Sequence, residues 1–312
     1  MKRIATLVGL VIGLCFVGAA FYIVRNPERA TLDDAARKNA PGHFIRLSDG
    51  VTHYDISGPD TGRTVMLVHG FSVPYYIWDS TATALANAGY RVVRYDEYGR
   101  GLSDRPESDY GVELFDRQLT ELLDSLQITD RIDLAGVSMG GSVAGVFAGR
   151  HHERVRSLVL VDPVAGTTGR SQGKFGWPLI GPYLWQTLAV PAMAEGQASD
   201  FVDATRFPDW ADRYREQMRY RGFGRALLAS RRARLGMMMD SVYQRVARNA
   251  VPVLLLWGTS DHTVPFRLNA GVRKAIPAAE FHAIDGAAHL PILEKARQTD
   301  SLILAFLARQ PR

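Results

Sequence analysis

Residues 133–145 read DLAGVSMGGSVAG, and their pattern is the clearest indication of how this chain folds. Its first half is an apolar run typical of a strand, and Gly136, Ser138, Gly140 and Gly141 crowd the point where that run ends. The pattern Gly-x-Ser-x-Gly is typical of a sharp turn from a strand into a helix, with the serine at the apex. A plain tight turn is the alternative, because the pattern also occurs by chance. Its position between a buried strand and a helix favours an exposed serine nucleophile.

On both sides of this turn, short β-rich runs alternate with helical patterns. Such alternation predicts an α/β fold, a mostly parallel sheet whose strands are connected through helices. The expected strands are His43–Leu47, Val51–Ile56, Thr64–Val68, Arg91–Tyr95, Ile132–Ala135, Val155–Val161, Val251–Trp257 and Glu280–Ile284. The expected helices are Trp78–Asn87, Val112–Leu126, Met139–Gly149 and Ile292–Leu307.

An aspartate and a histidine follow two later strands. Asp261 lies directly after an apolar strand, in LLLWGTSDHTVP, and His289 follows the next strand, in IDGAAHLPILEKA. Because parallel strands end at one edge of a sheet, Ser138, Asp261 and His289 should meet there. A serine hydroxyl needs a base, and the base needs an orienting acid, so the three residues predict nucleophilic catalysis. Taken singly, Asp261 could cap a turn and His289 could be a buried structural histidine.

Two backbone amides are candidates for an oxyanion hole. Residues 69–71 (HGF) end another apolar strand, and Met139 follows the serine. The N–H groups of Phe71 and Met139 would donate to the developing oxyanion, and loss of one such donor costs about 3–4 kcal/mol of transition-state stabilisation. We expect the neutral imidazole of His69 to hold this loop rather than to transfer protons.

The chain resembles the α/β-hydrolase superfamily over about residues 42–310. The blocks HGFSVP, YDEYGRGLSDRP, GVSMGG, WGTSDHTVP and GAAHLPILE match the blocks of that superfamily in order. The chain is most similar to its capped group of monoacylglycerol-lipase-like and meta-cleavage-product hydrolases. The resemblance implies an eight-stranded sheet, Ser138 as nucleophile, His289 as general base and then acid, and Asp261 as orienting acid. Asp162 occupies a position that some relatives use for the acid, but the block around Asp261 matches more completely.

The first residues differ in character from the rest of the chain. Ile4–Val24 is an apolar run without a charge, and as a helix it would span about 30 Å, the thickness of the hydrocarbon core of a bilayer. Its length favours an uncleaved anchor. A cleaved signal peptide is the alternative, because residues 18–20 (GAA) resemble a cleavage region. Lys2 and Arg3 predict a catalytic domain outside the cytoplasm, membrane-anchored, or secreted or periplasmic after cleavage.

The chain divides into five expected segments. No strand occurs at the expected spacing between about residues 166 and 250, which predicts a helical insertion over the sheet edge. The segments are a membrane anchor or signal at 1–25, a linker at 26–41, the first part of the hydrolase core at 42–165, a helical cap at 166–250 and the second part of the core at 251–312.

The composition limits the kinds of partner. The chain carries 37 basic and 32 acidic residues, and Cys15 is the only cysteine, so an intramolecular disulfide and a cysteine-based metal site are excluded. Arginines gather in the cap between Arg206 and Arg234, which indicates a solvated face with ion pairs or a face toward anionic lipid headgroups. A nucleic-acid partner is not expected, since the sequence has no matching motif.

The cap sequence indicates a hydrophobic substrate. The apolar run Trp177–Met193 and the three methionines at 237–239 could line an acyl pocket or pack in the core. We therefore expect a serine hydrolase, a carboxylesterase or lipase that cleaves esters, including monoacylglycerol-like lipids, without a cofactor or metal. Hydrolysis of a C–C bond, as in meta-cleavage products, is the first alternative, and a non-catalytic anchored binding module is the second. The oligomeric state is not predicted.

Overall fold

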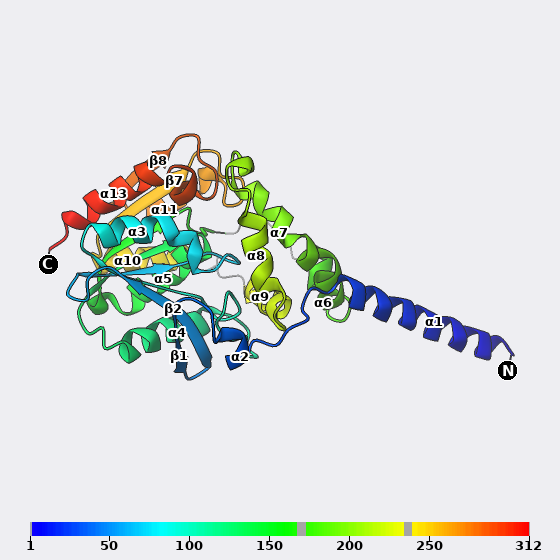
Figure 1. The fold of residues 1–312 in the computed structure, drawn as a ribbon. Coiled ribbons are helices and arrows are strands. Elements are labelled where there is room, and N and C mark those ends of the chain that lie inside the picture. The colour runs from blue at the N-terminus through cyan, green and yellow to red at the C-terminus, as the bar shows by residue number, and fades with distance from the viewer. Residues whose placement is uncertain (1, 167–172, 234–238, 312) are drawn as a thin grey trace.

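A single mixed sheet forms the centre of the computed structural model, which describes residues 2–166, 173–233 and 239–311 (Figure 1). Its eight strands are β1 His43–Leu47, β2 Gly50–Ser57, β3 Thr64–Val68, β4 Arg91–Tyr95, β5 Ile132–Val137, β6 Val155–Val161, β7 Val253–Gly258 and β8 Glu280–Ile284. Their order is β1-β2-β4-β3-β5-β6-β7-β8. β2 pairs antiparallel with β1 and with β4, and the other neighbours are parallel. The predicted α/β-hydrolase fold is confirmed.

Helices cover both faces of the sheet. On each face, side chains of the helices and of the strands pack together in one hydrophobic cluster. α4 (Val112–Ser125), α5 (Met139–Arg150), α10 (Met239–Arg248) and α11 (Asn269–Ala275) contribute to one cluster, and α3 (Asp79–Asn87) and α13 (Ala296–Ala308) contribute to the other. The short helix α12 (Pro291–Glu294) directly precedes α13.

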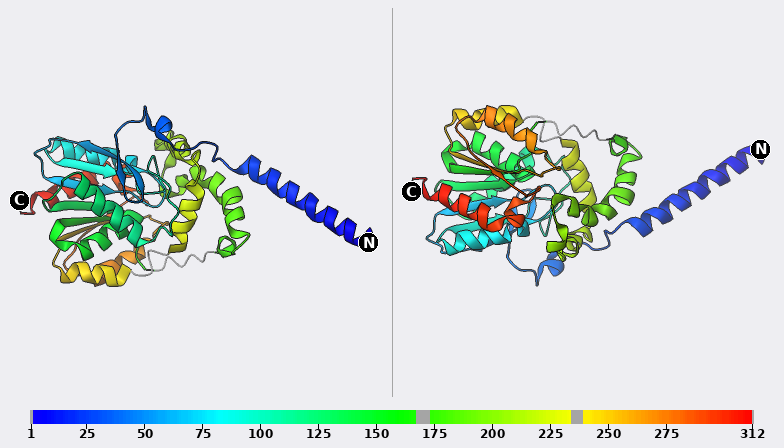
Figure 2. Two further views of the ribbon diagram at one scale, coloured as in Figure 1. Left: turned by 90° about the horizontal axis from the view of Figure 1, so that it is seen from below. Right: turned by 90° about the horizontal axis from the view of Figure 1, so that it is seen from above.

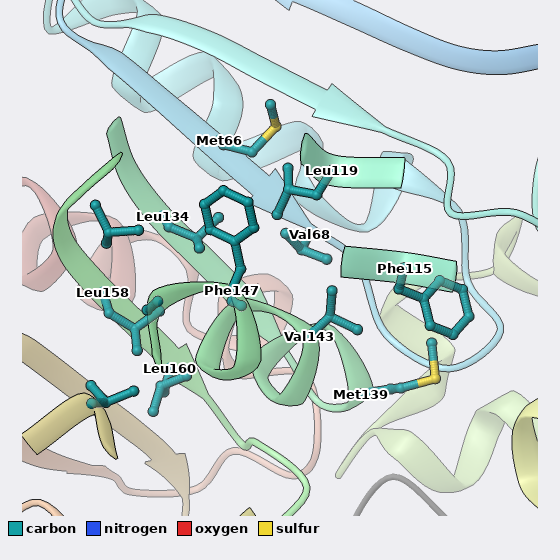
Figure 3. Packing of buried hydrophobic residues seen from close by; sticks show 14 of the residues in the cluster. Met66, Val68, Phe115, Leu119, Leu134, Met139, Val143, Phe147, Leu158 and Leu160 are labelled. Carbon is teal, nitrogen blue, oxygen red and sulfur yellow. The ribbon is translucent and has the colours of Figure 1, made fainter. Parts of the chain in front are cut away.

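The central strand β3 serves both clusters at once. Met66 and Val68 pack in the first cluster, which Figure 3 shows around Phe147 of α5. Their neighbours Val65 and Leu67 pack in the second cluster, because successive side chains of a strand point to opposite faces. Burying each such side chain contributes about 1.5–3 kcal/mol. This packing on both faces holds the strands and α5 in place, and with them the residues that follow the strand ends.

Between β6 and β7 the chain forms short helices that lie beyond the carboxyl edge of the sheet (Figures 1 and 2). The helices of this cap are α6 Gly181–Leu184, a π-helical turn Trp185–Ala189, α7 Met193–Gly196, α8 Trp210–Met218 and α9 Phe223–Ala233, with short 3-10 turns between them.

The last helix of the predicted cap segment behaves differently. Tyr243 and Val246 of α10 are buried in the first core cluster, and the Tyr243 hydroxyl donates to the carbonyl oxygen of Val164 at 3.1 Å. α10 therefore packs against α5 and belongs structurally with the core, although the sequence pattern groups it with the cap.

The N-terminal helix α1 (Lys2–Arg25) projects from the cap side of the molecule, away from the C-terminus (Figures 1 and 2). By length and composition it is able to cross a membrane, and none of its apolar window is buried.

The segment 26–41, expected as a linker, is ordered by contacts with the body. The Glu28 carboxylate accepts the backbone N–H groups of Gly222 and Gly224 at 2.6 and 2.7 Å. Farther along, α2 (Asp34–Arg37) ends in a buried arginine that forms an ion pair with Asp104. These contacts hold segment 26–41 against the cap and against the loop after β4.

Candidate active site

Ser138 lies at the turn between β5 and α5, in a strained backbone conformation. Its φ of 55° and ψ of −121° fall in a region that residues with a side chain rarely adopt. Close packing imposes this geometry, since a Cβ on Gly140 would lie 2.1 Å from the carbonyl oxygen of His69. The glycines of residues 133–145 thus let α5 begin directly against the end of β3. Ser138 lies at the N-terminus of α5, and its side chain is 7% exposed.

Asp261 and His289 form a buried hydrogen-bonded pair at the same edge of the sheet. Nδ1 of His289 donates to Oδ2 of Asp261 at 2.8 Å. The other carboxylate oxygen accepts the backbone N–H groups of Thr263 and Val264 at 2.8 and 2.9 Å. With the proton held on Nδ1, Nε2 of His289 is the basic nitrogen, as a general base requires.

The rival acid Asp162 lies beside this pair instead of replacing it. Asp162, Asp261 and His289 each place one polar side-chain atom within 4.8 Å of those of the other two residues. Oδ1 of Asp162 accepts the backbone N–H of Gly258 at 2.8 Å. Burial, and then the nearby charge of Asp261, raise the pKa of Asp162 well above its usual range. A protonated Asp162 is able to donate a hydrogen bond to Asp261 and so to support its carboxylate.

The proposed oxyanion-hole residues come from the loop after β3 and from the start of α5. A Cβ on Gly70 would lie 3.3 Å from the Cβ of Ser138, so the loop after β3 runs directly past Ser138. Phe71 follows in that loop, and Met139 is the first residue of α5. Free amides at a helix N-terminus favour negative charge on a bound group.

His69 holds this loop in the manner expected from the sequence. Its Nε2 accepts the backbone N–H of Glu97 at 2.8 Å, and its Nδ1 donates to the carbonyl oxygen of Gly70 at 2.8 Å. Burial lowers the pKa of His69 to about 4, so the ring is neutral at physiological pH. A neutral ring with both nitrogens hydrogen-bonded to the backbone holds the loop after β3 against the loop after β4.

Arg100 is a site residue that the sequence reasoning missed. Its fully buried guanidinium donates to the carbonyl oxygen of Phe71 at 2.8 Å and to Oγ of Ser230 in α9 at 2.8 Å. It also lies 3.8 Å from Sδ of Met139. Arg100 thereby connects Phe71 and Met139 to the cap. Arg100 stands within the block YDEYGRGLSDRP, but its partners are distant in the chain, so no local pattern indicates this role.

Glu294 is a second missed residue, and it joins the cap to the histidine loop. Its two carboxylate oxygens accept the backbone N–H groups of Val202 at 2.7 Å and Ala288 at 2.6 Å. Next to these bonds, the backbone N–H of His289 donates to the carbonyl oxygen of Asp200 at 3.1 Å. The cap segment around Asp200 and the loop that carries His289 are thus held together as one unit.

The apolar cap residues expected to line an acyl pocket or pack in the core divide into two groups. Trp185 and Val190 are buried in the second core cluster. Trp177, Leu179 and Ile180 are exposed and do not pack in the core. Of the three methionines, Met239 is buried, and positions 237 and 238 lie outside the described residues.

Comparison with known proteins gives a consistent family and differing substrates. A family model described as the alpha/beta hydrolase fold matches residues 63–296. A putative non-heme haloperoxidase of Mycobacterium phage D29 is 29% identical, over 86% of this chain and 96% of its own. A 2-hydroxy-6-oxononadienedioate/2-hydroxy-6-oxononatrienedioate hydrolase of Paraburkholderia phymatum is 30% identical, over 86% of this chain and 96% of its own. The crystal structure of a membrane phospholipase A, described as a bacterial virulence factor, has a TM-score of 0.68 and 25% identity, and the match covers 99% of this chain and 98% of that one.

Proposed function

Because the chain belongs to the α/β-hydrolase fold family, we propose that it is a membrane-anchored serine hydrolase that cleaves carboxylic esters of lipid-like substrates. Ser138 is the proposed nucleophile, His289 the general base and acid, and Asp261 the orienting acid. The observation that carries this proposal is the buried 2.8 Å hydrogen bond between Asp261 and Nδ1 of His289, at the sheet edge where Ser138 occupies its strained turn.

In the proposed mechanism, Oγ of Ser138 attacks the ester carbonyl while Nε2 of His289 takes the hydroxyl proton. The carboxylate of Asp261 stabilises the imidazolium, and the N–H groups of Phe71 and Met139 stabilise the oxyanion. When the tetrahedral intermediate collapses, the alcohol leaves with the proton from His289, and the acyl group remains on Ser138. Water then attacks the acyl-enzyme and gives its proton to His289, which returns it to Ser138 as the acid departs.

Two observations favour a lipid-like ester. The chain begins with a helix able to cross a membrane. The likeness to the membrane phospholipase A covers 99% of this chain, so it extends into α1. An enzyme held at a bilayer meets its highest local concentration of esters among the lipids themselves.

The proposal is tested with the full chain in detergent micelles and a panel of p-nitrophenyl esters and monoacylglycerols. We expect ester hydrolysis by the wild type and a loss of roughly 10⁴-fold or more in Ser138→Ala. Ser142→Ala is the matched control, because Ser142 is a buried serine one turn later in α5 and should be dispensable for the chemistry. A folded wild-type chain that turns over no ester would contradict the esterase proposal and favour a non-catalytic binding module.

A C–C bond hydrolase is the second candidate, and the 30% identity to the Paraburkholderia phymatum hydrolase favours it. The same three residues would serve that reaction. Direct competition between the two substrate classes separates the candidates: a kcat/KM for vinylogous diketo acids that exceeds the value for every ester tested would assign the chain to C–C hydrolysis.

A further inference from the structure

Large apolar side chains are exposed on one edge of the cap. Outside α1, the described residues include five exposed large hydrophobic side chains, and four of them fall between residues 177 and 188. Exposed apolar residues scattered singly need no explanation, but a cluster of them marks an interaction surface. The four are Trp177 (57% exposed), Leu179 (91%), Ile180 (54%) and Leu188 (38%), and we refer to them as the cap edge.

The cap edge is continuous with the N-terminal helix. The hydroxyl of Tyr183 in α6 donates to the carbonyl oxygen of Gly18 at 2.9 Å, and the rings of Tyr22 and Tyr183 stack with centroids 6.1 Å apart. Nε of Arg25 donates to the carbonyl oxygen of Thr187 at 3.2 Å. Figure 1 shows α6 beside the end of α1 that enters the body.

These contacts fix how deep the cap edge would lie when α1 spans a bilayer. Gly18 precedes Arg25 by seven residues, which corresponds to about 10 Å along a helix axis. Arg25 belongs near the headgroups, so Gly18 lies inside the apolar layer, and Tyr183 must follow it to that depth. Tyrosine and tryptophan are enriched at the membrane–water interface, because their rings are apolar and their polar atoms reach water. Tyr22, three residues before Arg25, and its stacking partner Tyr183 would extend from that interface into the apolar layer.

A groove beside the cap edge has the chemical character of a lipid contact. It has a volume of about 800 Å³ and lies between α1 and the cap. Tyr22, Trp185 and Leu228 contribute apolar surface. Arg225 and Arg232 contribute two positive charges, against one negative charge from Asp109. Apolar surface next to guanidinium groups suits the acyl chains and the phosphate of a phospholipid.

We infer that the cap edge docks into the bilayer that holds α1, within the leaflet on the side of the catalytic domain. This inference rests on the membrane anchoring contained in the proposed function. The same cap carries Asp200, whose carbonyl oxygen binds the backbone N–H of His289. Docking would therefore hold the catalytic loops at the membrane surface, where an ester reaches Ser138 from the lipid layer.

The test uses the full chain, reconstituted into phosphatidylcholine–phosphatidylglycerol vesicles. Cys15, the only cysteine, is replaced by serine, and an environment-sensitive fluorophore is attached at Leu179→Cys. Val202→Cys is the matched control, because Val202 is 58% exposed in the cap and its backbone is bonded to Glu294 of the core. We expect a blue-shifted emission at position 179 that nitroxide-labelled lipids quench, and a water-like, unquenched emission at position 202.

Three outcomes separate the docking from the anchoring. Chain that does not float with the vesicles overturns the anchoring, and the docking with it. Chain that floats but shows no quenching at position 179 overturns the docking alone. A blue shift without quenching indicates a protein–protein contact at the cap edge and likewise overturns the docking.

A functional measurement gives an independent readout. The triple variant Trp177→Ser/Leu179→Ser/Ile180→Ser changes only exposed side chains, so we expect it to fold and to hydrolyse a soluble p-nitrophenyl ester at the wild-type rate. Hydrolysis of a phospholipid or monoacylglycerol within vesicles should fall several-fold. Equal losses on both substrates, or no loss on vesicles, would contradict the docking and leave the proposed catalytic residues unaffected.

Discussion

Glu97 lies directly after the residue that follows β4 and carries a buried carboxyl group close to His69. It is fully buried, and neither carboxylate oxygen has a hydrogen-bond partner among the residues that the structure describes. Its Oε2 lies 3.6 Å from Nδ1 of His69. Burial raises the pKa of Glu97 to about 8, although the charge of Arg100 acts in the opposite direction. The folded protein therefore keeps a proton on Glu97 that the unfolded chain has released at neutral pH.

This difference predicts how stability depends on pH. Between the ordinary glutamate pKa and about 8, the folded state binds one more proton than the unfolded state, so the unfolding free energy falls as pH rises. Glu97→Gln removes the ionisation and should be more stable than wild type by a margin that widens with pH. The limiting slope is about 1.4 kcal/mol per pH unit. The measurement is the unfolding free energy of the full chain in micelles from pH 5 to pH 9.

The exposed Glu107 provides the control for that experiment. Glu107→Gln should track the wild type across the pH range. A Glu97→Gln margin that stays constant from pH 5 to pH 9 would show that Glu97 is already ionised in the fold.

Among individual residues, those that belong to a sequence motif were predictable from the sequence. Residues whose role depends on partners far away in the chain were missed. Ser138, Asp261 and His289 follow β5, β7 and β8, so the parallel sheet alone predicts that they lie at one edge. The role of Arg100 depends on Ser230, which is 130 positions away. Glu97 follows β4 like a loop residue, and only the packed structure reveals that its carboxyl group is buried.

The cap and the histidine loop are coupled elements, and Glu294 is the side chain that couples them. Glu294→Gln would replace one acceptor oxygen by an NH₂ group, so the N–H of either Val202 or Ala288 would face a donor. We expect the unfolding free energy to fall by about 1–3 kcal/mol. Hydrogen exchange should accelerate at Val202 and in the loop around His289. Peptide-resolved exchange by mass spectrometry measures both regions.

A surface glutamate in the same cap serves as the comparison. Glu216 is exposed and pairs with Arg219, so Glu216→Gln should leave the exchange pattern unchanged. If Glu294→Gln exchanges like the wild type in both regions, the two elements are not coupled through this carboxylate.

Strands and helices were predictable where the sequence carries a clear apolar pattern. Segments whose structure depends on contacts with distant residues were missed. All eight strands were predicted within two residues of their observed ends. α11 was missed because it spans only Asn269–Ala275, includes a glycine and buries only Asn269 and Val272. The ordering of segment 26–41 depends on Glu28, whose amide partners lie more than 190 residues away. No local pattern contains such information.

In the whole molecule, the N-terminal helix, the cap and the candidate active site lie on the same side of the sheet (Figures 1 and 2). α1 leaves from the cap side, the cap lies over the carboxyl edge of the sheet, and Ser138, Asp261 and His289 follow strands at that edge (Figures 1 and 2). The family and the sheet were predictable from the motif blocks. The orientation of α1 was not predictable, because it depends on contacts of Gly18 and Arg25 with the cap.

The most direct measurement is the mapping of a covalent adduct on the full chain in vesicles, using a fluorophosphonate that reacts only with an activated serine. We predict a single phosphonylated site at Ser138, found by peptide mass spectrometry, and no adduct in folded Ser138→Ala. A folded wild-type chain without an adduct at Ser138, or labelling that persists undiminished in Ser138→Ala, would contradict the proposed catalytic site.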